Sequence, residues 1–243
     1  MSIGCVSIDQ HNCIQIADEN LTKILDDLKL EKDALVLDLP SSNEAIKLSS
    51  LFWQQQARDI VLVVREGSCK IIDDFSFDRN IQIVALGGSE FRYSFELKKS
   101  CEFSLKLFLY KGAFIQVSGV YKLNKKHCVK ILTEQHHLEP NASSNLMVKG
   151  VVEDEAEINY VGKIFVNESA YGSVVSQKNK TLILSEAAKA VSIPSMEVLN
   201  KDVQCAHGAA IAHVDQDQMF YLQSRGFEPA QAKKLIIQSF LDS

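Results

Sequence analysis

A cysteine and a histidine near the end of the chain are the residues best placed to do chemistry. Cys205 and His207 stand in QCAHGAAIAH, whose alternating small and apolar residues are typical of a strand. Because side chains alternate between the two faces of a strand, the thiol and the imidazole project from the same face. A neighbouring imidazolium favours the thiolate, which acts as a nucleophile or as a soft-metal ligand. By spacing alone the pair fits half of a nucleophilic dyad, part of an iron or iron–sulfur site, or two neighbours without a shared role.

The composition excludes several classes of protein. With 243 residues, 46% of them hydrophobic and 23% charged, the chain has the make-up of an ordinary globular protein. Its net charge of -5 argues against generic binding to nucleic acid or to an anionic membrane. A helix that crosses a bilayer needs about 20 apolar residues, and no apolar run of the chain is that long. The first residues do not resemble a secretory signal. The six cysteines form no CxxC pair, which indicates free thiols in a cytoplasmic protein.

The first 66 residues alternate patterns of helix and strand. Residues 18–30 have the apolar periodicity of a helix, and the runs ALVLDL and DIVLVV are typical of buried strands. Between these runs, Ser41 and Glu44 have the spacing of a capping box and predict a second helix. We therefore expect residues 1–66 to form a small α/β unit. No glycine-rich phosphate loop follows either strand, so the sequence has no nucleotide-binding motif.

Residues 67–212 form a second region made of short strands. Runs such as NIQIVAL, EFSLKLFLY and TLILSE follow one another, separated by brief turns, and no helix of useful length intervenes. The Asn-Gly and Asp-Gly pairs that mark tight hairpins are absent. Stacked short strands with tight corners favour a β-helix, in which each coil packs on its neighbour. A β-sandwich is the alternative that the pattern leaves open.

Residues 213–243 have the pattern of two helices. Asp215 is a candidate N-cap for the first helix, and Gly226 supplies a left-handed stop. One face of the second helix is apolar, so this helix packs on the end of the β core or receives a partner. The candidate partner-binding residues of this region are Arg225, Leu235, Ile236 and Phe240.

Longer stretches of the chain resemble the SufB/SufD family of scaffold subunits for iron–sulfur cluster assembly. The segment KDVQCAHGAAIAHVDQDQMFYLQSRGFEPAQAKKLIIQSF resembles the C-terminal signature of that family. Upstream the chain has His-x-x-Pro-x-x-Ser, Gly-Lys-Ile-x-Val, and Leu-Ser-Glu followed by Pro-x-x-Glu. The resemblance covers approximately residues 101–240. It implies a right-handed parallel β-helix followed by a helical region, which agrees with the pattern of strands.

Within the family the chain resembles the SufD type. SufB-type chains have a glutamate where this sequence has Gly208, and a functional cysteine at the position of Asn179. The resemblance also implies a short variant, since family members continue beyond the position of Ser243.

The resemblance implies a role for the cysteine and the histidine. Cys205 and His207 would be shared ligands of iron or of a transient iron–sulfur cluster, at an interface with a SufB-like subunit or a second copy. Two ligands are too few for a cluster, which takes about four. A SufC-like ABC ATPase would supply the ATP chemistry, and the chain itself would be a scaffold and not an enzyme. The sequence neither indicates nor excludes a flavin.

Two enzymatic functions remain as alternatives. A β-helix carbohydrate-active enzyme needs paired carboxylates, and the β region offers no convincing acidic pair. A hydrolase based on Cys205 and His207 needs an oxyanion hole and an orienting third residue, for which no motif is visible. The adjacent His136 and His137 face opposite ways on a strand and are interpreted as structural.

Overall fold

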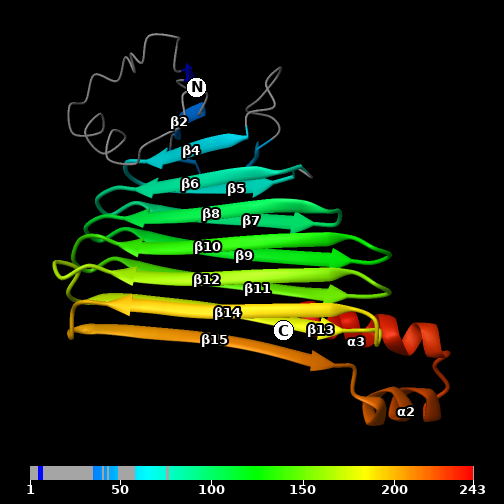
Figure 1. The fold of residues 1–243 in the computed structure, drawn as a ribbon. Coiled ribbons are helices and arrows are strands. Elements are labelled where there is room, and N and C mark those ends of the chain that lie inside the picture. Colours follow the sequence, from blue (N-terminus) through cyan, green and yellow to red (C-terminus); the bar gives the residue numbers. More distant parts are fainter. Residues whose placement is uncertain are drawn as a thin grey trace.

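The described part of the molecule is a two-sheet β-solenoid followed by two helices (Figure 1). The computed structural model describes residues 5–7, 35–39, 41–42, 44–48, 58–74 and 77–242. Sheet A contains, in spatial order, β1 (Cys5–Ser7), β2 (Leu35–Leu39), β4 (Asp59–Val64), β6 (Arg79–Ala85), β8 (Cys101–Leu109), β10 (Cys128–His137), β12 (Glu157–Val166) and β14 (Lys189–Val198). Sheet B contains β3 (Ala45–Lys47), β5 (Ser68–Asp73), β7 (Glu90–Leu97), β9 (Phe114–Leu123), β11 (Ser143–Val152), β13 (Ser173–Ile183) and β15 (Val203–His213).

From β2 onward, consecutive strands alternate between the two sheets, so each pair of strands makes one coil. Within a sheet, strands of successive coils pair in parallel: Thr133 of β10 lies beside Gly162 of β12, and Gln177 of β13 lies beside His207 of β15. Among the strand pairs of the described residues, only β1 and β2 are antiparallel. The predicted parallel β-helix is therefore confirmed. The β-sandwich is excluded, because sandwiches are built from antiparallel sheets.

The corners on one side of the solenoid share a single backbone conformation. Gly88, Gly112, Asn141 and Gly172 occupy equivalent positions in four successive coils, and all have positive φ, from 59° to 71°. The N–H of each donates to a carbonyl of the next corner, as from Gly112 to Pro140 at 3.0 Å. Glycine and asparagine adopt this left-handed conformation at little cost. The corners therefore stack as a hydrogen-bonded ladder, which sets the register of the strands on either side.

The interior of the solenoid changes from apolar to polar toward its C-terminal end. The earlier coils are filled largely by aliphatic and aromatic side chains, among them Phe91, Phe103 and Leu105. The later coils bury polar side chains between the sheets, namely Thr133, Gln135, His137, Ser144, Gln177, Asn179 and Thr181. Because a buried polar group is costly without a hydrogen-bond partner, these side chains fix one another's orientation.

Two helices follow the last strand, as predicted. Helix α2 (Gln216–Ser224) begins after Asp215, whose carboxylate accepts a hydrogen bond from the Asp217 N–H. Its end is marked by Gly226, with φ of 92°. Helix α3 (Pro229–Asp242) lies beside sheet B, where Lys149 donates to the carbonyl of Phe240 at 3.4 Å. A cation at the C-terminal end of a helix complements the helix dipole.

The second helix predicted in the N-terminal unit is wrong where the structure describes it. Residues 45–47 form β3, which pairs in parallel with β5, so the ladder overrides the local capping signal. The Oγ atom of Ser42, not Ser41, accepts from the Glu44 N–H. The boundary expected at residue 66 does not divide the sheets, because β4 pairs with β6 across it. The helix predicted over 18–30 lies outside the described residues.

Candidate functional site

Cys205 and His207 lie on β15, the last strand of the solenoid. In the parallel register Cys205 is beside Val175, and His207 is beside Gln177. Both of these neighbours are buried and point into the interior, so the thiol and the imidazole also point inward from one face. The same-face placement expected from the alternation is therefore present. Both side chains are only partly buried, because within the described residues no strand pairs with the outer edge of β15.

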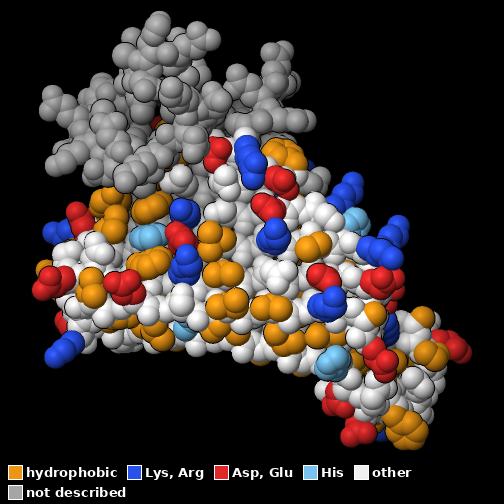
Figure 2. All heavy atoms as spheres, viewed as in Figure 1, with side chains coloured by type: hydrophobic (Ala, Val, Ile, Leu, Met, Phe, Trp, Pro, Cys, Tyr) orange, Lys and Arg blue, Asp and Glu red, His pale blue; other side chains and the backbone are white. Residues whose placement is uncertain are grey.

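The last coil leaves its inner side open. Side chains that would be buried in any earlier coil are exposed here: Met196 is 55% exposed and Ile211 is 43% exposed. The outer side of β14 adds Val191 and Ile193 to the exposed apolar surface. Figure 2 shows hydrophobic side chains gathered over the lower strands of sheet A at this end. Exposed apolar surface of this kind is typical of a protein–protein contact.

The immediate surroundings of Cys205 are apolar. Its side chain packs against a small cluster that contains Ile164, Val166 and Val175. Burial raises the pKa of the Cys205 thiol, and burial lowers the pKa of the His207 imidazole. Both shifts favour the neutral form, as desolvation does in general. In the single chain the pair is therefore a thiol and a neutral imidazole, and the thiolate–imidazolium pair considered from the sequence is not what this environment favours.

The chemistry open to this pair is that of a partial metal site. A thiol sulfur and a neutral imidazole nitrogen are ligands suited to iron and to iron–sulfur clusters. Within the described residues no group of three or more His, Cys, Asp or Glu side chains could hold a metal ion. A cluster at this position would need ligands from outside the described part of this chain. The raised pKa of the Cys205 thiol also gives no support to a Cys–His hydrolase, since that reaction requires the thiolate.

The structure shows which residues surround Asn179 and Gly208, the two positions at which SufB-type chains differ. Asn179 is buried in β13 and donates to the Val148 carbonyl at 3.3 Å. It pairs with Ala209, not with Cys205. Gly208 points outward, and an added Cβ there would meet no heavy atom within 4 Å. Neither position adds a ligand to the site formed by Cys205 and His207.

The candidate partner-binding residues lie apart from this pair, in the helical region. Leu235, Ile236 and Phe240 line a groove of about 1040 Å³ between α2, α3 and the ends of β13 and β15. Arg225 follows α2, and its guanidinium lies 5.2 Å from the centre of the Tyr221 ring. The three apolar residues are thus brought together, while Arg225 contacts its own helix.

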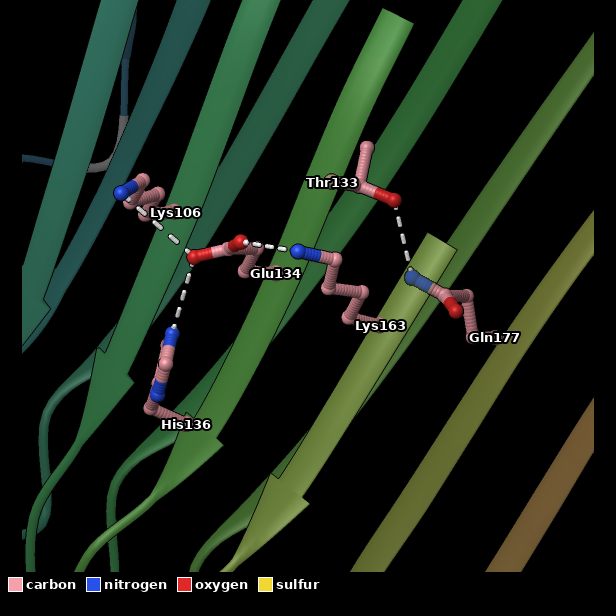
Figure 3. Close-up of polar contacts among 6 residues, drawn as sticks. All are labelled: Lys106, Thr133, Glu134, His136, Lys163 and Gln177. Atoms are coloured by element: carbon pink, nitrogen blue, oxygen red, sulfur yellow. Dashed lines mark hydrogen bonds and ion pairs between the residues drawn. The ribbon is translucent and has the colours of Figure 1, made fainter. Parts of the chain in front are cut away.

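A charged cluster on the outer face of sheet A was not expected from the sequence. Glu134 lies between Lys106 and Lys163 of the neighbouring strands, at 3.5 and 3.3 Å, and His136 is 3.3 Å away (Figure 3). The hydrogen bond from His136 and the two ammonium groups lower the pKa of Glu134 to about 2. The His136 ring is stacked between two phenyl rings, while His137 points inward. The two histidines lie on opposite faces, as predicted. In the sequence EQHH, strand alternation also places Glu134 and His136 on the same face, which was the available signal for the cluster.

An internal network beside the pair was also missed. Gln177 extends across the interior, and its Nε2 donates to Thr133 Oγ1 of the other sheet at 2.9 Å (Figure 3). Thr133 Oγ1 lies 2.7 Å from the hydroxyl of Tyr160. The polar residues at alternate positions of β13, beginning with Gln177, were the only signal for this network in the sequence.

Comparison with known proteins identifies the family. The chain matches the SufBD core domain of the SUF system for FeS cluster assembly over residues 103–240, more than half of its length. The chain belongs to the SufBD core family. The matched region begins in β8 and includes the open last coil, Cys205, His207 and most of α3.

Several curated SufBD proteins are similar to this chain. A SufBD family iron–sulfur cluster assembly protein of Synechocystis is 33% identical over 101 residues, which are 42% of this chain and 22% of that protein. A SufBD family protein of Mycobacterium tuberculosis is 28% identical over 137 residues, covering 53% of this chain and 34% of that protein. The SufB protein of Bacillus subtilis is 30% identical over 106 residues, covering 44% of this chain and 23% of SufB.

This SufBD chain therefore aligns with 34% or less of the length of each of these relatives. The relatives include a SufB and members described only as SufBD family proteins, so they place the chain in the family without separating SufD from SufB. In the part of the chain that is described, no helix is long and apolar enough to cross a membrane.

Proposed function

We propose that this chain is a SufD-like scaffold subunit of a cytoplasmic iron–sulfur cluster assembly complex. It contributes Cys205 and His207 to a site that it shares with a SufB-like subunit, or with a second copy where no such subunit is present. Iron or the nascent cluster is the cargo of this site and not a resident cofactor. Membership of the SufBD core family supports an assembly role of this general kind.

The observation that carries the proposal is the open inner side of the last coil. The only inward-facing thiol–imidazole pair of the described residues lies in the coil whose inner face is not covered. Met196 and Ile211, on the same inner side, form apolar surface around the pair. A second subunit that covers this coil would bury the apolar surface and enclose the ligands in one step.

The donor set suits transient binding of the cargo. Iron–sulfur clusters take about four thiolate or imidazole ligands, so two from each subunit would complete the set. Coordination of Cys205 would displace its proton, because a metal-bound thiol is deprotonated. A site divided between subunits loses half of its ligands when the subunits move apart, which provides a route for release of the product.

The ATP chemistry in this proposal belongs to a separate SufC-like ATPase. The sequence contains no GxxxxGK[ST] loop that would bind the phosphates of ATP. The groove lined by Leu235, Ile236 and Phe240 is the apolar surface next to the solenoid end that such a subunit could use. The chain would then act as a scaffold and not as an enzyme.

Substitution of the two ligands tests this function. Cys205→Ser exchanges a soft thiolate for a hard hydroxyl at almost constant volume, and His207→Ala removes the imidazole. Each variant is expected to fold, to bind the SufB-like subunit, and to leave cluster assembly deficient in cells that lack the native chain. Cluster-dependent enzyme activity and the iron and sulfide content of the purified complex are the measurements.

A matched control is Cys128→Ser, because Cys128 is an exposed free thiol on β10, away from the open coil. It should support normal assembly. The double variant of Cys205 and His207 should be little worse than either single variant, because residues that act as one unit are not additive. Normal cluster assembly by both single variants would show that the pair is structural and that the proposal is wrong.

A further inference from the structure

The side chain of Gln177 is held in one orientation across the interior of the solenoid. Gln177 is completely buried, and its Nε2 donates to Thr133 Oγ1 at 2.9 Å, on the opposite sheet (Figure 3). Thr133 is itself held by the Tyr160 hydroxyl at 2.7 Å. The amide nitrogen therefore points toward β10, and the amide oxygen must point away from it.

A glycine on β12 makes room for the amide oxygen. A Cβ added to Gly162 would lie 2.6 Å from Gln177 Oε1, which is too close for any other residue type without a shift. Gly162 pairs with Thr133 on one side and with Pro194 of the last coil on the other. Gln177 Oε1 thus lies beside β12, the strand of sheet A between β10 and the last coil.

This oxygen has no hydrogen-bond partner among the described residues. A buried amide oxygen without a donor is costly, so a nearby N–H or O–H is expected to satisfy it. In the row of paired residues that contains Gln177, the next coil offers Pro194 on sheet A and His207 on sheet B. Proline has no N–H to donate, whereas a neutral imidazole has one. The last coil also has the buried hydroxyl of Ser192, but Ser192 pairs with Tyr160, two positions from the row of Gln177.

We propose that Gln177 is a positioning residue for His207, with Gln177 Oε1 accepting the hydrogen of one ring nitrogen. Neighbouring strands lie about 4.8 Å apart, so the His207 ring enters the interior one strand spacing from Gln177 and on the same inner face. The proposal rests on the proposed function, since it assigns His207 as a ligand, and it adds the residue that selects the tautomer of that ligand.

The consequence is that the ligating nitrogen is chosen in advance. A histidine ligand whose other nitrogen donates to a fixed acceptor has one tautomer and one ring orientation. With one nitrogen of His207 turned toward Gln177 in the interior, the lone pair of the other nitrogen faces the open end of the coil.

Nitrogen-15 NMR of histidine-labelled, metal-free chain tests the hydrogen bond directly. In the native chain the two ring nitrogens of His207 should have the separate shifts of a single neutral tautomer. Gln177→Met keeps the length of the side chain but has no comparable acceptor, and should move both shifts toward the tautomer mixture of free imidazole. Gln177→Glu keeps an acceptor oxygen and, at a pH high enough to keep the imidazole neutral beside the new carboxylate, should retain a single tautomer. The test therefore does not depend on whether the methionine variant folds.

Asn179→Leu is the matched control. Asn179 is buried two residues along the same strand and also has an oxygen without a partner, but its neighbour is Ala209. Its replacement should leave the His207 tautomer unchanged. A tautomer mixture at His207 in the native chain, or a single tautomer that persists in Gln177→Met, would overturn the assignment.

A second measurement separates this inference from the proposed function. In the purified complex, Gln177→Met should weaken iron binding by about tenfold or more, as loss of the hydrogen-bond partner of a histidine ligand does. If the tautomer changes while iron binding and cluster assembly stay normal, Gln177 positions His207 but His207 is not a ligand. If the tautomer does not change, the positioning role is refuted whatever the outcome for assembly.

Discussion

The buried histidine His137 is expected to make the protein sensitive to mild acid. His137 is 0% exposed, its Nε2 lies 2.7 Å from Ser144 Oγ, and burial lowers its pKa from 6.5 to about 4. In the unfolded chain the imidazole takes up a proton as the pH falls through 6.5, whereas in the folded chain it does so only near 4. Below the unfolded pKa the unfolded state therefore binds more protons, and stability is lost as the pH falls through this window.

The loss amounts to about 2 kcal/mol between pH 7 and pH 5 for a shift of this size. Urea unfolding of the native chain and of His137→Asn at the two pH values measures it. The variant should be less stable at pH 7, because the hydrogen bond to Ser144 is altered, but it should lose about 2 kcal/mol less than the native chain on going to pH 5. Other titrating groups contribute equally to both chains and cancel in this difference.

Thr133→Val is the matched control for this measurement. Thr133 is buried on the same strand and does not titrate, so its replacement should lower stability by a similar amount at both pH values. Equal losses between pH 7 and pH 5 for the native chain and for His137→Asn would refute the reasoning. Such a result would mean that the folded protein accommodates the protonated ring.

Two further predictions concern packing and docking. Gly150→Ala should cost about 1–3 kcal/mol in thermal or urea unfolding, because the added Cβ would lie 2.0 Å from ring carbons of Tyr121; Gly208→Ala, with no heavy atom within 4 Å, should be nearly neutral. Phe240→Ala should weaken binding of the proposed SufC-like ATPase by about 1 kcal/mol or more in calorimetry, if the helical groove is the docking surface. Unchanged affinity with intact folding would assign Phe240 to packing alone.

The strands and the faces of their side chains were predictable because that information is local and periodic, whereas the choice of a β-helix over a β-sandwich needed the resemblance to the SufB/SufD family. Alternation of side chains placed His136 and His137 on opposite faces, and Cys205 and His207 on one face. The ends of α2 followed from Asp215 and Gly226. Each of these inferences needs only residues within a few positions of one another. The helix expected after Ser41 was wrong for the complementary reason, since pairing with a strand of the next coil decided that conformation.

The surroundings of the site were not predictable in the same way. Gln177 and Thr133 are 44 positions apart and meet only because the coils stack in register. The pKa directions of Cys205 and His207 depend on their place in the last coil, where burial is partial and no charge is close enough to oppose it. Spacing in the sequence indicates which side chains share a face, but not how much water or charge surrounds them.

The ladder of left-handed corners has a consequence for how this molecule can vary in length. Each corner is hydrogen-bonded to the corner before it and to the corner after it: Lys111 accepts from the Gly88 N–H, and Gly112 donates to Pro140. A whole coil could therefore be duplicated or deleted with the same pattern of hydrogen bonds between the remaining corners. An insertion of one residue within a strand would instead turn the side chains that follow it to the opposite face of the sheet. The solenoid can thus differ in height by whole coils, while Cys205 and His207 keep their place on its last strand.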